Sequence, residues 1–181
     1  MPISVYGDLY DWNNANLNCF RNMVNLPDEL IELFDDIMER FGRGYSASRY
    51  DDAYKNLVTL FEIILIGYNS NDRGKGKKEK FANRLAAAIA DDEHVQSVHD
   101  DALAMYVERS NETHEGKNQN ITKDELKKLR CAVRKLVLYF IAFSYTNYNM
   151  ISDKSFQGLK KEYVIGLLAR INILQANGHL Q

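Results

Sequence analysis

An arginine and a histidine five positions apart, Arg109 and His114, are the residues of this sequence best suited to phosphodiester chemistry. A guanidinium is a permanent cation whose planar fork matches the oxygens of a phosphate. An imidazole exchanges a proton near neutral pH and is the side chain most often used as a general acid or base. Such a pair can cleave a phosphodiester bond without a metal ion, so we expect neither a metal site nor a cofactor.

The spacing of this pair limits how the two residues can act together. Five residues on an α-helix correspond to a rotation of about 140°, so two such side chains diverge on an unbroken helix. They converge only if the helix ends between them or if a second chain supplies one of the two. Asn111 and Gly116 favour an ending near residues 112–118. The alternative is that Arg109 is a surface cation and His114 a turn residue.

A single carboxylate, Glu62, interrupts the apolar run over residues 60–66. A buried charge is unfavourable unless an opposite charge compensates it. We therefore expect Glu62 to pair with a cation, and Arg109 is the candidate, because the pairing would orient its guanidinium. The alternative is that Glu62 lies at an exposed edge of its helix.

The elements that must position these residues are helices. Apolar residues recur with the 3.6-residue period of amphipathic helices, and no segment has the alternation of a strand. Gly42 and Gly44 are expected to end the first helix, and Thr122 opens the fifth with a capping box that Glu125 completes. The sequence therefore predicts an all-α bundle. Its helices are expected over about residues 28–41, 48–66, 77–90, 92–111, 123–145 and 155–176.

Composition and length fit one globular domain that is not bound to a membrane. The chain has 181 residues, of which 45% are hydrophobic, and no apolar run is long enough to span a bilayer. Its start lacks the pattern of a signal peptide. The two cysteines, Cys19 and Cys131, match no metal or redox spacing. We therefore expect a reduced, cytoplasmic setting.

Two local basic patches suit an anionic partner, although the formal net charge is only −2. The first patch covers residues 73–84, and the second follows the helix expected over residues 123–145. The alternative is that both are solvated helix faces. The second patch consists of Lys123, Lys127, Lys128, Arg130, Arg134 and Lys135.

Three features in this order resemble the HEPN superfamily, and most closely its Apea-like branch. They are the apolar helix ending at residues 60–65, the helical stretch over residues 80–87, and residues 105–114 followed by a long amphipathic helix. The resemblance covers about residues 48–145 and implies a HEPN-like helical core. Residues 1–47 are then an N-terminal extension with one helix, and residues 146–181 form a C-terminal helix packed on the core.

The resemblance implies a metal-independent endoribonuclease that acts as a homodimer, with the arginines and histidines of both protomers lining one cleft. By position, His114 would assist attack of a ribose 2′-hydroxyl on the adjacent phosphate, leaving a cyclic phosphate, and Arg109 would stabilise the developing charge. Glu62, Ser110 and Asn111 would support them. Family members often serve in prokaryotic defence against phages or as toxin modules. The residues expected to contact RNA are Lys75, Lys77, Lys78, Arg84 and Lys117.

The surroundings of the histidine depart from the family pattern. Glu112 and Thr113 stand where the family usually has an aliphatic residue before the histidine, and Glu115 precedes the expected glycine. An extra carboxylate beside the histidine would repel a phosphate. A second hypothesis is therefore a non-catalytic helical interaction or sensor module on the same fold, with a regulatory protein as its partner.

Overall fold

The structure, a computed structural model, describes residues 28–69, 72, 76–115 and 121–181, except for the side chains of residues 109–115. The described residues form helices and no strand, which confirms the predicted all-α bundle. Its HEPN-like topology stays a prediction. The helices are α2 (Asp28–Ser46), α3 (Tyr50–Leu65), α4 (Lys77–Ile89), α5 (Val95–Glu115), α6 (Lys123–Asn147) and α7 (Phe156–Ala176).

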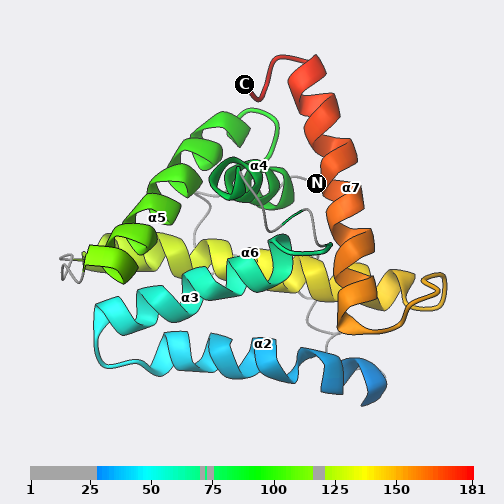
Figure 1. Ribbon diagram of the computed structural model, residues 1–181, viewed down its shortest axis with the longest axis horizontal. Helices are drawn as coiled ribbons and strands as arrows, with labels where there is room; N and C mark the ends of the chain where they lie inside the picture. Colours follow the sequence, from blue (N-terminus) through cyan, green and yellow to red (C-terminus); the bar gives the residue numbers. More distant parts are fainter. Residues whose placement is uncertain (1–27, 70–71, 73–75, 116–120) are drawn as a thin grey trace.

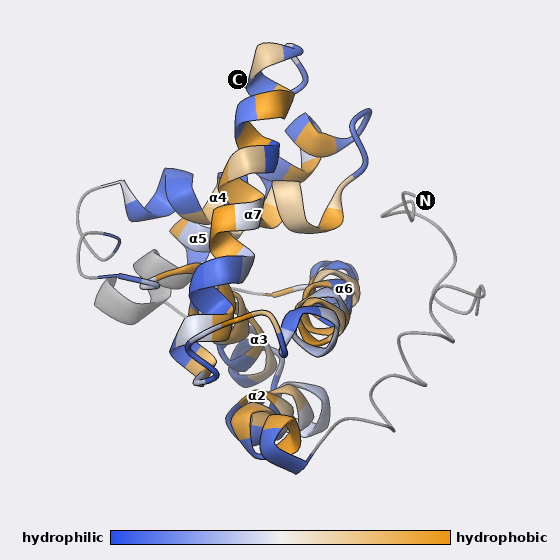
Figure 2. Ribbon diagram, turned by 90° about the vertical axis from the view of Figure 1, so that its right-hand side faces the viewer, coloured by the Kyte–Doolittle hydropathy of each residue, from blue (hydrophilic) through white to orange (hydrophobic). Residues whose placement is uncertain are grey.

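Helix α3 lies at the centre of the bundle. Helices α2, α3 and α6 lie across Figure 1, with α2 running opposite to α3 and α6, and α4 points towards the viewer between α5 and α7. Figure 2 shows the same bundle turned by 90°, with α2 and α6 seen nearly end-on. Helix α3 packs against each of the other five described helices. This position agrees with its apolar sequence, because a helix with neighbours on several sides needs apolar residues on several faces.

One hydrophobic core joins all the described helices. The ring of Phe140 on α6 contacts Phe34 of α2, Phe156 at the start of α7 and Tyr163 of α7, with centroid distances of 5.6, 5.7 and 5.2 Å. Residues of the predicted N-terminal extension and of the C-terminal helix therefore pack in the same core as residues 48–145.

The helix ends confirm one sequence prediction and correct another. The capping box of α6 is present: the Glu125 amide donates to the Thr122 hydroxyl at 3.2 Å, and the Thr122 amide donates to the Glu125 carboxylate at 2.7 Å. The expected end of α2 at Gly42 and Gly44 is wrong, because the helix continues to Ser46. Gly44 instead allows close packing, since an added Cβ would lie 2.5 Å from a methyl carbon of Leu57.

Cationic side chains from other helices bind the carbonyl groups at the ends of α2 and α4. The last turn of a helix leaves carbonyls without intrahelical partners, and the helix dipole favours positive charge there. A guanidinium nitrogen of Arg130, on α6, lies 3.3 Å from the Tyr45 carbonyl of α2. Arg170, on α7, donates at 2.8 Å to each of two carbonyls at the end of α4, those of Ala87 and Ala90.

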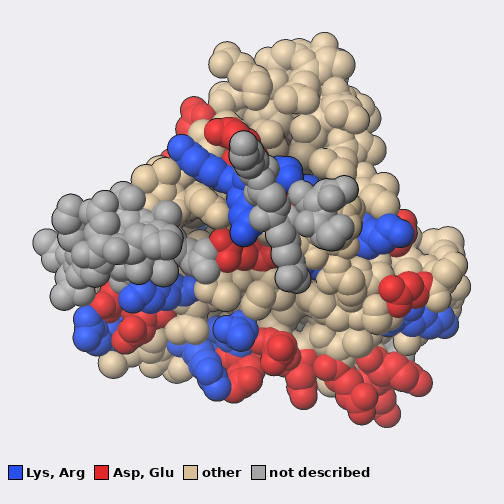
Figure 3. Space-filling view, in the orientation of Figure 1, with Lys and Arg blue, Asp and Glu red and all other residues tan. Residues whose placement is uncertain are grey.

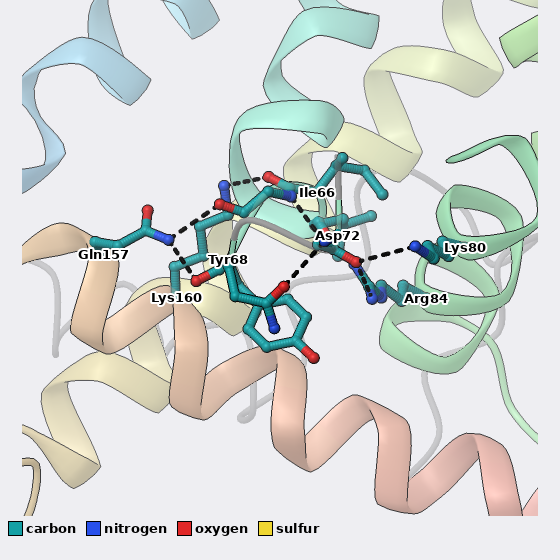
Figure 4. Close-up of polar contacts among 10 residues, drawn as sticks. Ile66, Tyr68, Asp72, Lys80, Arg84, Gln157 and Lys160 are labelled. Atoms are coloured by element: carbon teal, nitrogen blue, oxygen red, sulfur yellow. Dashed lines mark hydrogen bonds and ion pairs between the residues drawn. The ribbon is translucent and has the colours of Figure 1, made fainter. Parts of the chain in front are cut away.

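The end of α3 is held by two buried cations (Figure 4). Arg84 of α4 is 3% exposed; it donates to the Leu65 carbonyl at 2.6 Å and forms two hydrogen bonds of 2.7 Å with Asp72. Lys160 of α7 is also buried and donates to the Ile66 carbonyl. The expectation that Arg84 contacts RNA is therefore not supported, because its charge is buried and already bound to a carboxylate.

Asp72 joins the loop after α3 to α4. Its carboxylate accepts a hydrogen bond of 2.6 Å from the Gly67 amide and lies 3.8 Å from the ammonium of Lys80. Burial by itself raises the pKa of this carboxyl group. The hydrogen bonds from Arg84 and Gly67 and the nearby positive charges outweigh that effect and hold the pKa below its ordinary value of 3.8.

Replacing Arg84 tests whether this junction stabilises the fold. In Arg84→Met the Asp72 carboxylate loses its nearest cation and the Leu65 carbonyl loses its donor in a buried site, so we expect the free energy of unfolding at pH 7 to fall by about 3 kcal/mol. The measurement is urea denaturation followed by circular dichroism. Lys78→Met, at an exposed position of the same helix, is the matched control and should change stability by at most about 0.5 kcal/mol. Equal effects of the two substitutions would contradict the assignment.

The lowered pKa of Asp72 predicts how its contribution depends on pH. Because the pKa is lower in the folded state, the ionised carboxylate stabilises the fold fully above the unfolded-state pKa of about 4. This contribution is lost as the pH falls through the folded-state pKa. The stability difference between the wild type and Asp72→Asn should therefore be largest above about pH 5 and shrink towards about pH 2. Asp35→Asn, at an exposed position of α2, is the control; a difference for Asp72→Asn that does not vary with pH would count against the lowered pKa.

Candidate functional site

Arg109 and His114 lie on one continuous helix. Helix α5 extends from Val95 to Glu115, so it ends within the expected range of residues 112–118, but after His114 and not between the two residues. On this backbone their positions are about 140° apart around the helix. Positions so far apart around one helix favour the arrangement in which a second chain supplies one of the two residues. The side chains of both residues, and those of Ser110 and Asn111, lie outside the described residues.

The turn of α5 that precedes Arg109 is anchored on α3 and α4. The hydroxyl of Tyr54, on α3, lies 3.0 Å from the Glu108 carboxylate and 3.2 Å from the Met105 carbonyl. The ring of Phe81, on α4, contacts Tyr106 with a centroid distance of 5.3 Å. These contacts come from buried aromatic residues, so they fix the course of the helix just before the arginine.

Glu62 occupies a partly buried position on α3. It lies about two helical turns after Tyr54, the residue through which α3 holds α5. The sequence left two alternatives for Glu62, a buried carboxylate or an exposed edge of the helix, and the observed exposure is intermediate between them. The expected pairing with Arg109 stays a prediction, because the arginine side chain is outside the described residues.

The residues expected to contact RNA do not form one described surface. Lys77 and Lys78 are exposed in the first turn of α4, whereas Arg84 on the same helix is buried. Lys75 and Lys117 lie outside the described residues.

The described residues contain neither a candidate metal site nor a helix that could cross a membrane. No group of three His, Cys, Asp or Glu side chains in the described part of the chain lies close enough to hold a metal ion. Within those same ranges, none of the helices combines the length and the apolar character needed to cross a membrane.

A basic groove joins four cations of the second basic patch to two tyrosines that sequence reasoning did not place beside them. It has a volume of about 250 Å³ and lies where α6 meets the end of α2 and the start of α3. Its cations occupy positions i, i+4, i+7 and i+11 of α6, which lie on one face of a helix. This spacing is visible in the sequence, but the two tyrosines opposite it are brought there only by the fold. The groove is lined by Tyr45, Tyr50, Lys123, Lys127, Arg130 and Arg134.

The basic groove and the Arg109 motif lie at the same end of the molecule. Tyr50 lines the groove, and Tyr54, one turn later on α3, binds Glu108 of α5. In Figure 1 the start of α3, the end of α5 and the start of α6 all lie on the left. Both therefore lie near the start of α3, the groove on α6 and the motif on α5.

Removing the hydroxyl of Tyr54 tests the anchor of α5. In Tyr54→Phe a buried hydrogen bond is lost, so we expect the free energy of unfolding to fall by about 1 kcal/mol in urea denaturation. Tyr50→Phe is the matched control: its ring is exposed on the same helix, and removing its hydroxyl should leave stability unchanged within about 0.5 kcal/mol. If the two variants are equally stable, the hydrogen bond does not hold α5.

Comparison of the chain with protein-family models, with curated proteins and with solved structures finds no match. The resemblance to the HEPN superfamily therefore rests on the order of the motifs in the sequence. The features of the candidate site are the motif on α5, the Tyr54 anchor on α3 and the basic groove along α6.

Proposed function

We propose that the protein is a metal-independent endoribonuclease of the HEPN type that acts as a homodimer. The observation that supports this most is the unbroken course of α5 through both Arg109 and His114. Because the two positions diverge on one helix, an arginine can meet a histidine at a phosphate only across two chains. A shared cleft between two protomers is the arrangement that the family resemblance implies.

The proposed reaction needs only side chains of the motif and its support. The imidazole of His114 takes the proton of a ribose 2′-hydroxyl, and the 2′-oxygen forms a bond to the adjacent phosphorus. The bond from phosphorus to the 5′-oxygen breaks, and this oxygen takes up a proton, leaving a 2′,3′-cyclic phosphate and a 5′-hydroxyl. Arg109 stabilises the negative charge on the phosphate oxygens in the transition state. Glu62 orients Arg109, and Ser110 and Asn111 support the site.

The remaining parts of the proposal concern the setting. The substrate is RNA, and the basic groove between α6 and the start of α3 supports an anionic ligand. Following the family resemblance, the enzyme serves in prokaryotic defence or as a toxin-like nuclease, in the cytoplasm and under the control of a regulatory protein.

A non-catalytic interaction module is the second candidate, and two observations favour it. Glu112 and Glu115 flank His114 and would repel a phosphate. In addition, α7 exposes apolar side chains, with Ile165 43% and Ile173 61% exposed. Figure 2 shows apolar colour along α7, which faces the viewer there. An exposed apolar helix face suits a protein partner.

Mixing two inactive variants tests the nuclease and its dimeric site together. Arg109→Ala and His114→Ala should each reduce cleavage of single-stranded RNA, in the presence of a metal chelator, by about 10²–10⁴-fold. When equal amounts are unfolded together and refolded, half of the dimers are mixed, and each mixed dimer holds one intact pair. We therefore expect about a quarter of the wild-type activity to return.

The outcomes separate the candidates. Cleavage that is equal in the wild type and in both variants would come from a contaminant and would contradict the proposal. Active single variants that show no gain on mixing would place the two residues outside a shared site. A wild-type protein without cleavage that captures a protein partner through α7 would favour the interaction module.

A further inference from the structure

We propose that the basic groove binds single-stranded RNA, with backbone phosphates held by Lys123, Lys127 and Arg134 and one base stacked on Tyr50. The choice of RNA rests on the proposed function. The binding itself needs neither Arg109 nor the histidine of the motif.

Two of the residues that line the groove form its floor. The Tyr45 hydroxyl donates to the Arg130 carbonyl at 2.9 Å, and the Arg130 guanidinium lies 5.1 Å from the centre of the Tyr45 ring. The Tyr45 ring also contacts Phe41, with a centroid distance of 4.6 Å. Because these groups already bind one another, they make the floor rigid and leave ligand contacts to the other lining residues.

The remaining cations are available to a ligand. Lys123 and Lys127 are exposed, Arg134 is half-buried, and none of the three forms an ion pair within the described part of the chain. Along the axis of α6 they are separated by about 6 Å and about 10 Å. A row of separate cations on one helix face suits a chain of phosphates better than a single small anion.

Two of the carboxylates close in sequence to the lining residues are already bound, whereas Asp124, next to Lys123, is exposed. Asp51, next to Tyr50, accepts a hydrogen bond of 3.1 Å from Arg49. Glu125, between Lys123 and Lys127, is held in the capping box by Thr122. Neither carboxylate is therefore free to neutralise the cations of the groove.

The charges of α2 are distributed so that its C-terminal end, next to the groove, favours an anion. Its carboxylates lie between Asp28 and Glu39, and Figure 3 shows acidic side chains gathered along the lower edge, over α2. The end of α2 next to the groove instead carries Arg40 and Arg43, of which Arg43 is paired with Glu39. Such a separation of charge directs an anionic ligand towards the basic end.

The exposed ring of Tyr50 favours single-stranded RNA over a duplex. Tyr50 is 46% exposed at the edge of the groove. Proteins that bind single strands combine a positive groove with aromatic rings on which unpaired bases stack. In a duplex the bases are stacked on one another, and side chains reach mainly the phosphates and the 2′-hydroxyls. A tyrosine beside a row of cations therefore favours an unpaired strand.

Fluorescence anisotropy with a labelled 2′-O-methyl oligouridylate of about 12 nucleotides tests this groove. The methylated 2′-oxygen cannot attack the phosphate, so binding is measured without cleavage. Lys127→Ala should weaken binding about tenfold. It should also reduce the slope of log affinity against log salt concentration by about 0.7, the value for one phosphate contact with a single strand.

Matched variants of the full chain serve as controls. Lys128→Ala removes the same charge one position further along α6, about 100° away from the groove, and should leave both affinity and salt slope unchanged. Tyr50→Ala should weaken binding about tenfold, whereas Tyr50→Phe keeps the ring and should bind as the wild type does. Circular dichroism checks that each variant is folded.

Several results would overturn the proposal. If Lys127→Ala and Lys128→Ala weakened RNA binding equally, the binding would depend on the overall charge of α6 and not on the groove. Equal binding of a duplex of the same length, with no effect of Tyr50→Ala, would show a site for phosphates alone. If the variants of the groove bind normally while cleavage depends on Arg109, the groove is wrong and the nuclease stands. If binding depends on the groove but the protein does not cleave RNA, the groove stands and the nuclease is wrong.

Discussion

The end of α3 is the point on which the rest of the structure depends. This helix contacts every other described helix, and the carbonyls of its last turn point into the protein interior, where water cannot bind them. Arg84 from α4 and Lys160 from α7 bind two of these carbonyls, and Asp72 compensates the buried guanidinium. One polar junction thus satisfies a buried helix end and joins three helices.

Basic side chains also bind the terminal carbonyls at two other helix ends, so several basic residues of the chain have a structural role. Arg130 binds the end of α2, and Arg170 binds the end of α4. Guanidinium groups suit this task because they reach several carbonyls at once and are always charged. Basic side chains used in this way hold helices together, so the number of lysines and arginines overstates the positive surface that a ligand meets.

Four cations of α6 line the basic groove, where α6 meets the end of α2 and the start of α3. There Tyr54 binds the turn that precedes Arg109, and one turn earlier on α3 Tyr50 lines the basic groove. The basic groove and the Arg109 motif thus belong to different elements, α6 and α5. Under the proposed function, RNA binding and cleavage would be carried by these different elements.

The sequence by itself determined the helices. Periodicity and caps are local properties, so the six predicted helical segments and the Thr122 capping box are present in the structure, although α2 continues past the glycines expected to end it. Tertiary structure alone decided that α2 continues through Gly44, because the glycine allows close packing against Leu57 of α3. It also decided that Arg84 binds a buried carboxylate and not a ligand. It also brought Tyr45 and Tyr50 to the cations of α6. The partners in these contacts are distant in the chain, and no local pattern records which of them will meet.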